Sequence, residues 1–386
     1  MRDGAMTKLP LEGVTVLEFC QYLAGPYAGL RLADLGARVI KVERPRGGDA
    51  CRALATKDMW AGEDSVLFHT INRNKESFAA DLKDPEHLDI VRELVATADV
   101  VTHNFRPGVM ERIGLDYEAV KAINPEVVYG EVSGYGKEGP WAALPGQDLL
   151  AQARTGAMWH SGAADDPPTP LGLAVADMAC GLHLAQGILA ALVRRRRTGQ
   201  GGLVEVSLAE SLLDVQFEGL TVFLNHAGEL PARSRVAPAH PYLGAPYGVY
   251  ATSDSAIALS MGDVSRVLIA LGLDPVEEAP GADAFVERDE IKAQIEVQLA
   301  TRSTAEWMAR LNGVGHWACE VLDYARLADH DGYRVLGMEQ VVSRDDGISV
   351  RTTRCPIRVG GERLYSDRAA PRLGDANEQI MAELAS

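Results

Sequence analysis

Asp177 is the residue of this sequence whose type and position most directly suggest chemistry. It stands immediately before a long apolar segment, residues 178–193, whose composition predicts a buried helix. By position alone an aspartate there is an N-cap. The helix dipole would stabilise its carboxylate by about 0.3–1 kcal/mol and keep it ionised. An ionised carboxylate can also act as a nucleophile, so the sequence alone leaves both interpretations open.

The charge balance limits what such a site could bind. The chain has 386 residues, of which 54 are acidic and 38 are Lys or Arg, and its formal net charge is −16. Such a surface repels polyanions on average, which argues against nucleic acid as a partner. A smaller anionic ligand would need Arg and Lys side chains concentrated at one place.

Composition and cysteine spacing indicate a globular cytoplasmic protein. Five scattered cysteines without a CxxC pair argue against disulfides and structural zinc. No N-terminal segment combines a basic start, an apolar run and a cleavage site. The longest apolar stretch, residues 171–193, is interrupted by Asp177, His183 and Gln186, which argues against a membrane span.

The elements that must position Asp177 follow from hydrophobic periodicity. Short apolar runs predict strands at 14–19, 37–42 and 127–132 and another ending near Val101, and a helix is predicted over 26–35. Strands that alternate with helices predict βαβ units and a parallel sheet covered on both faces. Ligands of such sheets bind beyond the carboxyl ends of the strands.

The second half of the chain differs in its pattern of residue types. A strand at 203–206 and an amphipathic helix continue the first pattern, but Pro, His, Tyr and Gly cluster at 237–247. Two strand-like runs then flank a turn at 250–254, and residues 303–312 have helical spacing. These features predict a smaller α+β domain over residues 220–325.

The loop after the first strand argues against a dinucleotide cofactor. Glu43 ends the second strand, where a dinucleotide-binding fold holds a ribose hydroxyl, but the loop at residues 21–26 reads Gln-Tyr-Leu-Ala-Gly-Pro. One glycine followed by proline cannot present the backbone amides that a pyrophosphate needs. We therefore expect no NAD and no flavin, and the absence of clustered ligands predicts no metal.

A series of short segments gives a more specific signal than any single residue. They are the LEGVTVLEF run at 11–19, Ala24-Gly25-Pro26, the GARVIKVERP run at 36–45 with Gly48-Asp49, Asn72-Arg73-Asn74-Lys75, Asn104-Phe105-Arg106-Pro107-Gly108, Ser133-Gly134-Tyr135-Gly136 and Ala176-Asp177-Met178. In order and spacing they resemble the class III CoA-transferases, the family of formyl-CoA and carnitine CoA-transferases and of α-methylacyl-CoA racemase. The resemblance is densest over residues 9–215.

The resemblance implies an α/β fold. A large Rossmann-like domain with a parallel sheet would be formed by residues 1–219 and completed by residues 326–386, with the small α+β domain between them. Two chains would interlock as a homodimer, with CoA held between the large domain of one chain and the small domain of the other.

The resemblance also implies the chemistry. Asp177 matches the catalytic aspartate, which attacks an acyl-CoA thioester and passes through a mixed anhydride to an aspartyl-CoA thioester. A carboxylic acid then accepts the CoA. Coenzyme A, as acyl-CoA, would be the one cofactor, and no membrane partner is expected.

Several positions match CoA contacts of the family. They are Leu23 and Ala24 at the turn bordering the pantetheine, Arg44 after the second strand, Lys75, Ala80 and Lys83 in the nucleotide-contact segments, and Asn104, Phe105, Arg106 and Arg112 in the next loop. For any single Arg a surface salt bridge is the default interpretation. Their joint match to one anionic ligand favours CoA binding.

One substitution favours transfer over racemisation. The racemase branch supplies a His before an Asp upstream of the catalytic aspartate, whereas this sequence has Gly146-Gln147-Asp148. Gln147 has no proton to exchange at neutral pH, although it can donate a hydrogen bond to an oxyanion. Asp148 either orients a ligand or caps the next helix. A 2-methylacyl-CoA racemase using Asp177 as acid and base, and a non-catalytic CoA-binding protein, remain the alternatives.

The small domain departs from the formyl-CoA transferase branch. That branch closes a glycine-rich loop over its intermediates, and residues 239–247 form a stiffer sequence here. This argues against formyl or oxalyl transfer and leaves another carboxylic acid, such as the dicarboxylate succinate. His240 either lines the acyl pocket or packs within the loop.

Overall fold

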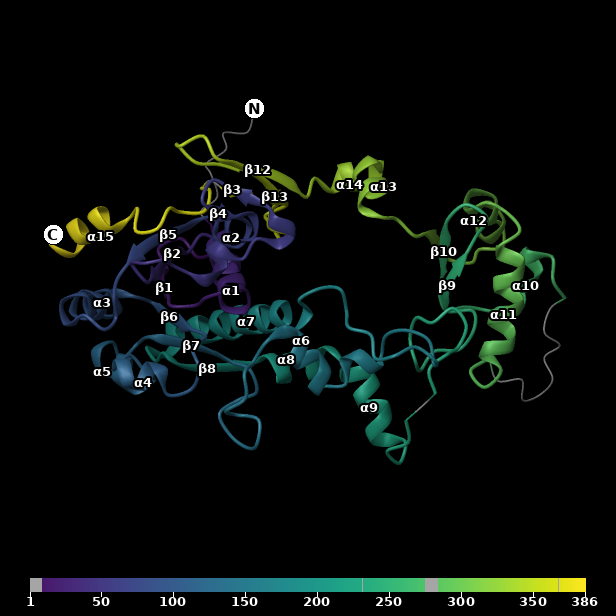
Figure 1. Ribbon diagram of the computed structural model, residues 1–386, viewed down its shortest axis with the longest axis horizontal. Coiled ribbons are helices and arrows are strands. Elements are labelled where there is room, and N and C mark those ends of the chain that lie inside the picture. The colour runs from purple at the N-terminus through teal and green to yellow at the C-terminus, as the bar shows by residue number, and fades with distance from the viewer. Residues whose placement is uncertain (1–8, 231, 275–283, 367) are drawn as a thin grey trace. The chain divides into compact units, whose positions relative to one another are not determined.

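The computed structural model describes residues 9–230, 232–274, 284–366 and 368–386 (Figure 1). The chain divides into two compact units. Unit 1 comprises Met1–Ala151, Ala174–Leu212 and Gly337–Ser386, and unit 2 comprises Gln152–Leu173 and Leu213–Leu336.

These boundaries differ from the ones predicted at residues 219 and 325. Residues 152–173, which were expected in the large domain, belong to unit 2, and the chain returns to unit 1 only at Gly337. Helices α13 (Tyr324–Asp329) and α14 (Asp331–Leu336) precede that return and bury no residue. Hydrophobic patterning therefore gives no sign of the unit to which they belong.

Unit 1 is built on a six-stranded sheet with the spatial order β5-β2-β1-β6-β7-β8. The strands are β1 (Thr15–Glu18), β2 (Arg38–Glu43), β5 (Lys75–Ala79), β6 (Val100–His103), β7 (Val128–Ser133) and β8 (Gly202–Ser207), and all neighbours pair in parallel. The predicted parallel α/β sheet is thus confirmed. The order reverses between β1 and β6, which is where a doubly wound sheet opens a crevice for ligands.

The edge strand β5 was not predicted. Its sequence, Lys75 to Ala79, contains two charged residues in five and lacks the apolar run of a buried parallel strand. Lys75 is nevertheless buried, because its ammonium group pairs with Glu18 of β1 beneath helix α1 (Ala24–Asp34). A buried ion pair therefore hides this strand from hydrophobic patterning.

Helices cover both faces of the sheet. On one face, α1 packs beside the long helix α7 (Val175–Thr198), which also contacts β7 and β8 (Figure 1). On the other face, α3 (Pro85–Thr97), α4 (Val109–Ile113) and α5 (Tyr117–Ile123) share one core with the sheet. That core includes Leu17, Ile40, Phe78, Val91, Leu94, Val101, Met110, Val120 and Tyr129.

Helix α7 is long and apolar enough to cross a membrane by length and composition, so its polar residues do not exclude a span as predicted. Its packing is that of a core helix, because it lies against α1 and the sheet and buries Leu184 and Ile188 completely. Gly181 permits this contact. A Cβ added there would lie 2.5 Å from the carbonyl oxygen of Ala24 in α1.

Unit 2 has its own core. The strands β9 (Gly248–Ala251), β10 (Ala256–Leu259) and β11 (Ala318–Glu320) form an antiparallel sheet. Helices α10 (Val264–Leu271), α11 (Arg288–Leu299) and α12 (Thr304–Gly313) pack against one another and the sheet around the buried side chain of Trp307.

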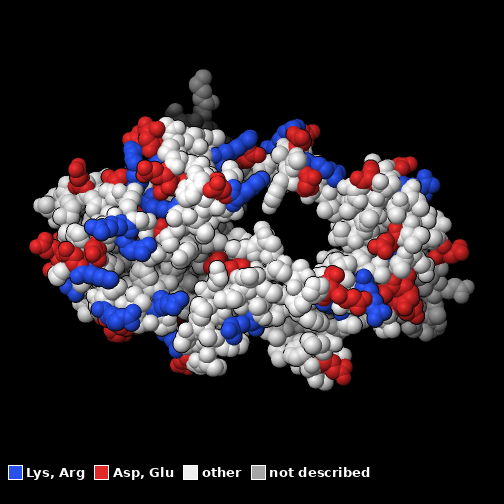
Figure 2. Space-filling view, viewed as in Figure 1, with Lys and Arg blue, Asp and Glu red and all other residues white. Residues whose placement is uncertain are grey.

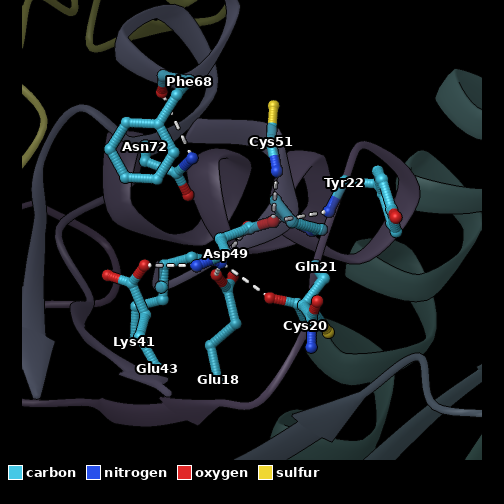
Figure 3. Close-up of polar contacts among 12 residues, drawn as sticks. Glu18, Cys20, Gln21, Tyr22, Lys41, Glu43, Asp49, Cys51, Phe68 and Asn72 are labelled. Atoms are coloured by element: carbon cyan, nitrogen blue, oxygen red, sulfur yellow. Dashed lines mark hydrogen bonds and ion pairs between the residues drawn. The ribbon is translucent and has the colours of Figure 1, made fainter. Parts of the chain in front are cut away.

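The face of the sheet beneath α1 carries buried charges. Glu18 and Lys41 are register partners on β1 and β2, and both are fully buried. The Lys41 ammonium pairs with Glu18 at 3.2 Å and with Asp49 at 2.8 Å, and it donates to the Cys20 carbonyl at 2.6 Å (Figure 3). Lys75 donates to Glu18 at 2.9 Å. Two buried carboxylates and two buried ammonium groups thus neutralise each other.

Asp49 links this network to the loop before α1. Its Oδ1 accepts hydrogen bonds from the backbone N–H groups of Tyr22, at 3.1 Å, and Cys51, at 2.9 Å (Figure 3). Its own N–H donates to Glu43 at 2.8 Å. One buried carboxylate therefore holds the loops that follow β1 and β2 together.

Removal of the shared carboxylate should destabilise unit 1 strongly. Glu18→Gln leaves Lys41 and Lys75 buried with one acid fewer, and breaking a buried pair in this way costs about 3–5 kcal/mol. The control Asp89→Asn breaks an exposed pair with Arg92, for which about 0–1 kcal/mol is typical. Urea unfolding followed by circular dichroism measures both, and equal free energies of unfolding for the two variants would contradict the prediction.

Candidate active site

A cavity of about 880 Å³ lies at the carboxyl ends of β1, β2 and β6. Its wall comes from four segments: the loops that follow β1 and β2, the residues after β5, and the loop with α4 that follows β6. The position agrees with the crevice expected where the strand order reverses. Cys20 and Gln21 from the β1 loop line it, as do the acids Glu43 and Asp49 from the β2 segment and Asp81 after β5.

The cavity collects five of the predicted CoA contacts. They are Arg44, Ala80, Lys83, Phe105 and Arg112. Arg46 is a further cation in its wall that the sequence analysis missed, although it follows Arg44 by two residues. Figure 2 shows Lys and Arg side chains gathered on unit 1 near α3, α4 and α5, on a chain that is acidic overall. The cations suit the phosphates of a nucleotide, and the aromatic ring and the buried alanine suit its flat base.

Glu43 does not offset these cations, because it is already neutralised inside the protein. Arg52 donates to both of its carboxylate oxygens, at 2.7 and 2.8 Å. Although burial works against ionisation, these bonds from Arg52 hold the pKa of Glu43 below its usual value. The Arg44 guanidinium donates to the Gly48 carbonyl, at 3.1 and 3.3 Å.

Lys75 does not lie in this cavity, so its prediction as a nucleotide contact is wrong. Its ammonium group is enclosed by Glu18, the Pro26 carbonyl and Asn72. Burial lowers the pKa of Lys75 to about 8. The family resemblance implied a nucleotide contact for Lys75, but its side chain points beneath α1 instead.

The other predicted contacts do not line this cavity. Asn104 fixes the loop after β1, which lines the cavity. The side-chain amide of Asn104 accepts from the Gln21 N–H at 2.8 Å and donates to the Gln21 carbonyl at 2.6 Å. Leu23 packs on a small apolar cluster with Phe68, and Ala24 is the buried first residue of α1. Arg106 is exposed and lines a separate cavity of about 220 Å³.

Asp177 lies in the first turn of α7, three residues after the N-cap position, which Ala174 occupies. The prediction that Asp177 is itself the N-cap is therefore wrong, because the helix begins at Val175, before the apolar run. Gly181, one turn further on, contacts Ala24 at the start of α1. The loop before α1 supplies Cys20 and Gln21 to the cavity, so the first turns of α7 lie against the helix that follows a cavity-lining loop.

Asp148 provides the missing cap. It is the first residue of α6 (Asp148–Arg154), and its Oδ1 accepts from the N–H groups of Ala176 at 2.7 Å and Asp177 at 3.2 Å. Of the two roles left open for Asp148, the structure shows a cap, but the capped helix is α7 rather than the one that Asp148 begins. This arrangement brings two carboxyl groups together.

Their proximity changes the acidity of Asp177. Burial, and after it the negative charge of Asp148, together raise the pKa of Asp177 to about 7. The expectation of an ionised carboxylate considered only the helix dipole, whereas burial and the charge of Asp148 act in the opposite direction. A carboxyl group that titrates near neutrality is typical of a functional site.

Gln147 and His240 lie in different surroundings. Gln147 is exposed, directly before Asp148. His240 belongs to unit 2, where its Nδ1 accepts from the Tyr242 N–H at 3.2 Å and its Nε2 lies 3.8 Å from Glu218. Within the described part of the chain, no group of three or more His, Cys, Asp or Glu side chains could hold a metal ion.

Comparison with known proteins gives a consistent result. Residues 11–377 match the model of CoA-transferase family III. The succinate–glutarate CoA-transferase of Agrobacterium fabrum is 34% identical, over 100% of this chain and 98% of that protein. The acetyl-CoA:oxalate CoA-transferase of Acetobacter aceti is 32% identical, over 99% of this chain and 97% of that protein. A crystal structure of a CAIB/BAIF family protein from Brucella suis is 32% identical, with a TM-score of 0.82 over 98% of this chain and all of the other.

The carboxyl pair makes a prediction about titration. Asp148→Asn keeps an oxygen to accept from Ala176 but removes the negative charge, so the midpoint of Asp177 should fall from about 7. Because burial remains, the midpoint should stay above the usual aspartate value. A ¹³C NMR titration of labelled aspartate measures it. Glu210→Gln is the control, because Glu210 acts on Cys180 but not detectably on Asp177. An equal shift in both variants would refute the pairing.

Proposed function

The chain belongs to CoA-transferase family III, and we propose that Asp177 is the nucleophile through which it moves CoA from an acyl-CoA thioester to a carboxylic acid. The observation that carries the proposal is the position of Asp177. It lies in the first turn of α7, where Gly181 brings α7 against the helix that follows the cavity-lining loop. Among the described residues, no cation forms an ion pair with its carboxyl group.

The first half of the reaction uses the ionised form of Asp177. A carboxylate oxygen attacks the thioester carbonyl carbon, the carbon–sulfur bond breaks, and CoA leaves as a thiolate. Asp177 and the acyl group now form a mixed anhydride. The thiolate attacks the side-chain carbonyl carbon of Asp177, which releases the donor acid as a carboxylate and leaves an aspartyl-CoA thioester.

The second half reverses these steps with a new acid. The acceptor carboxylate attacks the aspartyl-CoA carbonyl carbon and expels the CoA thiolate, and the thiolate then attacks the acceptor's carbonyl carbon. The acceptor leaves as its CoA thioester, and Asp177 returns as a carboxylate. No proton is gained or lost over the cycle, so the site needs no separate general base.

We assign the CoA nucleotide to the cavity of about 880 Å³. Arg44, Arg46, Lys83 and Arg112 would face its phosphates, and Phe105 offers an aromatic face for the adenine. A CoA molecule fixed at this end holds its thiol close to Asp177 during the several exchanges. Such tethering makes each exchange effectively intramolecular.

We propose a dicarboxylic acid as donor or acceptor. The relatives described above are named for succinate, glutarate and oxalate, and they match nearly the whole of this chain. The racemase alternative loses support because Gln147 is exposed and carries no exchangeable proton at neutral pH.

We further propose that the protein is an interlocked homodimer. Helix α9 (Phe217–Asn225) is strongly apolar, yet Gly219 is its one buried residue. Phe217 and Leu224 are each 67% exposed. An apolar face of this kind indicates a surface that another chain covers. Sedimentation at nanomolar concentration should give twice the chain mass, because interlocked chains cannot separate without unfolding; a folded monomer would disprove the interlocking.

The central experiment replaces the nucleophile. Asp177→Asn removes the ionised oxygen but keeps the size of the side chain, so transfer should fall at least ~10³-fold, toward the level without covalent catalysis. Because the CoA cavity is lined by other residues, the Kd of CoA should change less than about twofold. Arg112→Ala is the matched variant and should raise that Kd by about tenfold, the equivalent of one charged hydrogen bond. Isothermal titration and a mass-spectrometric transfer assay measure both effects.

Trapping separates the alternatives. Wild-type protein incubated with succinyl-CoA should carry a CoA adduct on the peptide that contains Asp177, and hydroxylamine should discharge it. Deuterium incorporation at the α-carbon of a 2-methylacyl-CoA without an adduct would support the racemase instead. Tight CoA binding with neither outcome would indicate a non-catalytic protein.

A further inference from the structure

Two loops of unit 1 touch backbone to backbone beside Asp148. A Cβ added to Gly134 would lie 2.6 Å from the Cα of Gly146, and a Cβ added to Gly146 would lie 2.5 Å from the Cα of Gly134. Carbon atoms in a packed interior do not approach so closely. Neither position can therefore carry a side chain unless one backbone moves.

Backbone conformation does not explain these glycines. Neither residue is among the chain's positive-φ positions, in contrast to Gly136 and Gly156 in the same region. A positive φ is therefore not what requires glycine at 134 and 146. The close approach itself is what requires glycine at both positions.

The contact joins the turn after β7 to the segment that carries Asp148. Gly134 directly follows β7, and its carbonyl accepts from the Ala209 N–H of α8 (Leu208–Val215) at 3.1 Å. Ser133 accepts from the Gly136 N–H at 2.9 Å and tightens the same turn. Gly146 lies two residues before Asp148, at the start of α6. The residue that follows the carboxyl end of β7 is thus in direct contact with the segment that carries Asp148.

We propose that Gly134 and Gly146 are positioning residues for the transfer reaction: their contact holds Asp148 where its carboxylate caps α7 and opposes Asp177. This inference rests on the proposed function, because it gives the contact a role in setting the nucleophile. Oδ1 of Asp148 spans only 2.7 Å to the Ala176 N–H. A shift of the α6 start by an added methyl group would lengthen that bond and move the carboxylate away from Asp177.

The electrostatic surroundings of Asp177 make the effect measurable. Among the described residues, Asp148 is the one charged group with a resolved influence on its titration. Cys180, one turn along α7, is a neutral thiol whose pKa is raised to about 12, chiefly by burial. Glu210 influences Cys180 rather than Asp177. A change in the Asp177 midpoint therefore reports on Asp148.

The test compares Gly146→Ala and Gly134→Ala with the wild type. In both variants the midpoint of Asp177 in the ¹³C titration, and that of kcat/KM against pH, should fall by at least half a unit. The maximal kcat should fall about 10–100-fold, the scale expected for a misplacement of about 1 Å. The KM for acyl-CoA should change less than twofold. Gly313→Ala, where an added Cβ meets no atom within 4 Å, should match the wild type.

A double variant tests whether the glycine substitutions act on Asp177 through Asp148. In the Asp148→Asn background, Gly146→Ala should no longer move the midpoint, because the charge that it displaces is already gone. A lowered kcat with an unchanged midpoint, or an equal midpoint shift in the Asp148→Asn background, would overturn the inference. Full transfer activity in Asp177→Asn would instead overturn the proposed function, while the titration would still decide whether the glycines place Asp148.

Discussion

The buried carboxylate of Glu18 is the constraint on which the rest of unit 1 depends. It lies between Lys41 and Lys75, and none of the three side chains reaches solvent. Ions removed from water are tolerated only when nearly every charge has a partner at close range. The three parallel strands β1, β2 and β5 must therefore keep the register that brings these groups together. An offset of one residue would turn each charge toward the apolar face beneath α3.

The same network makes the cavity available to an anion. Lys41 also neutralises Asp49, and Arg52 neutralises Glu43, so two of the three acids in the cavity wall are already paired inside the protein, Asp81 being the third. Arg46, Lys83 and Arg112 remain at the surface with their positive charge uncompensated by the two paired acids. A protein of net charge −16 can thus present a locally cationic site, because its internal ion pairs decide which charges face the ligand.

Sequence patterning predicted the elements whose burial is apolar and missed those whose burial is ionic. The runs at β1, β2, β6 and β7 predicted their strands to within two residues. Of the CoA contacts that the family resemblance implied, Arg44, Ala80, Lys83, Phe105 and Arg112 line one cavity, although their role in binding CoA stays a prediction. Strand β5 and the true position of Lys75 depend on a partner 57 residues away. No local pattern carries that information.

The cap of α7 illustrates the same limit at the active site. The aspartate at the start of the apolar run suggested an N-cap, whereas the cap comes from Asp148, 28 residues before Ala176. The resemblance identified both aspartates, but their mutual effect depends on their spatial arrangement. Only the fold shows that one carboxylate accepts the backbone N–H of the other.

The pairing of Asp148 with Asp177 affects the relative free energies of the states in the proposed reaction. While Asp177 is ionised it opposes the charge of Asp148 in a buried setting, and its raised pKa expresses the free-energy cost of that state. In the mixed anhydride and in the aspartyl-CoA thioester, the side chain of Asp177 carries no charge. Each acylation of Asp177 therefore relieves the repulsion, whereas Asp148 keeps its hydrogen bonds to the first turn of α7 throughout. The cap that fixes the helix also favours the covalent states over the free carboxylate, which a partnering cation in place of Asp148 would disfavour.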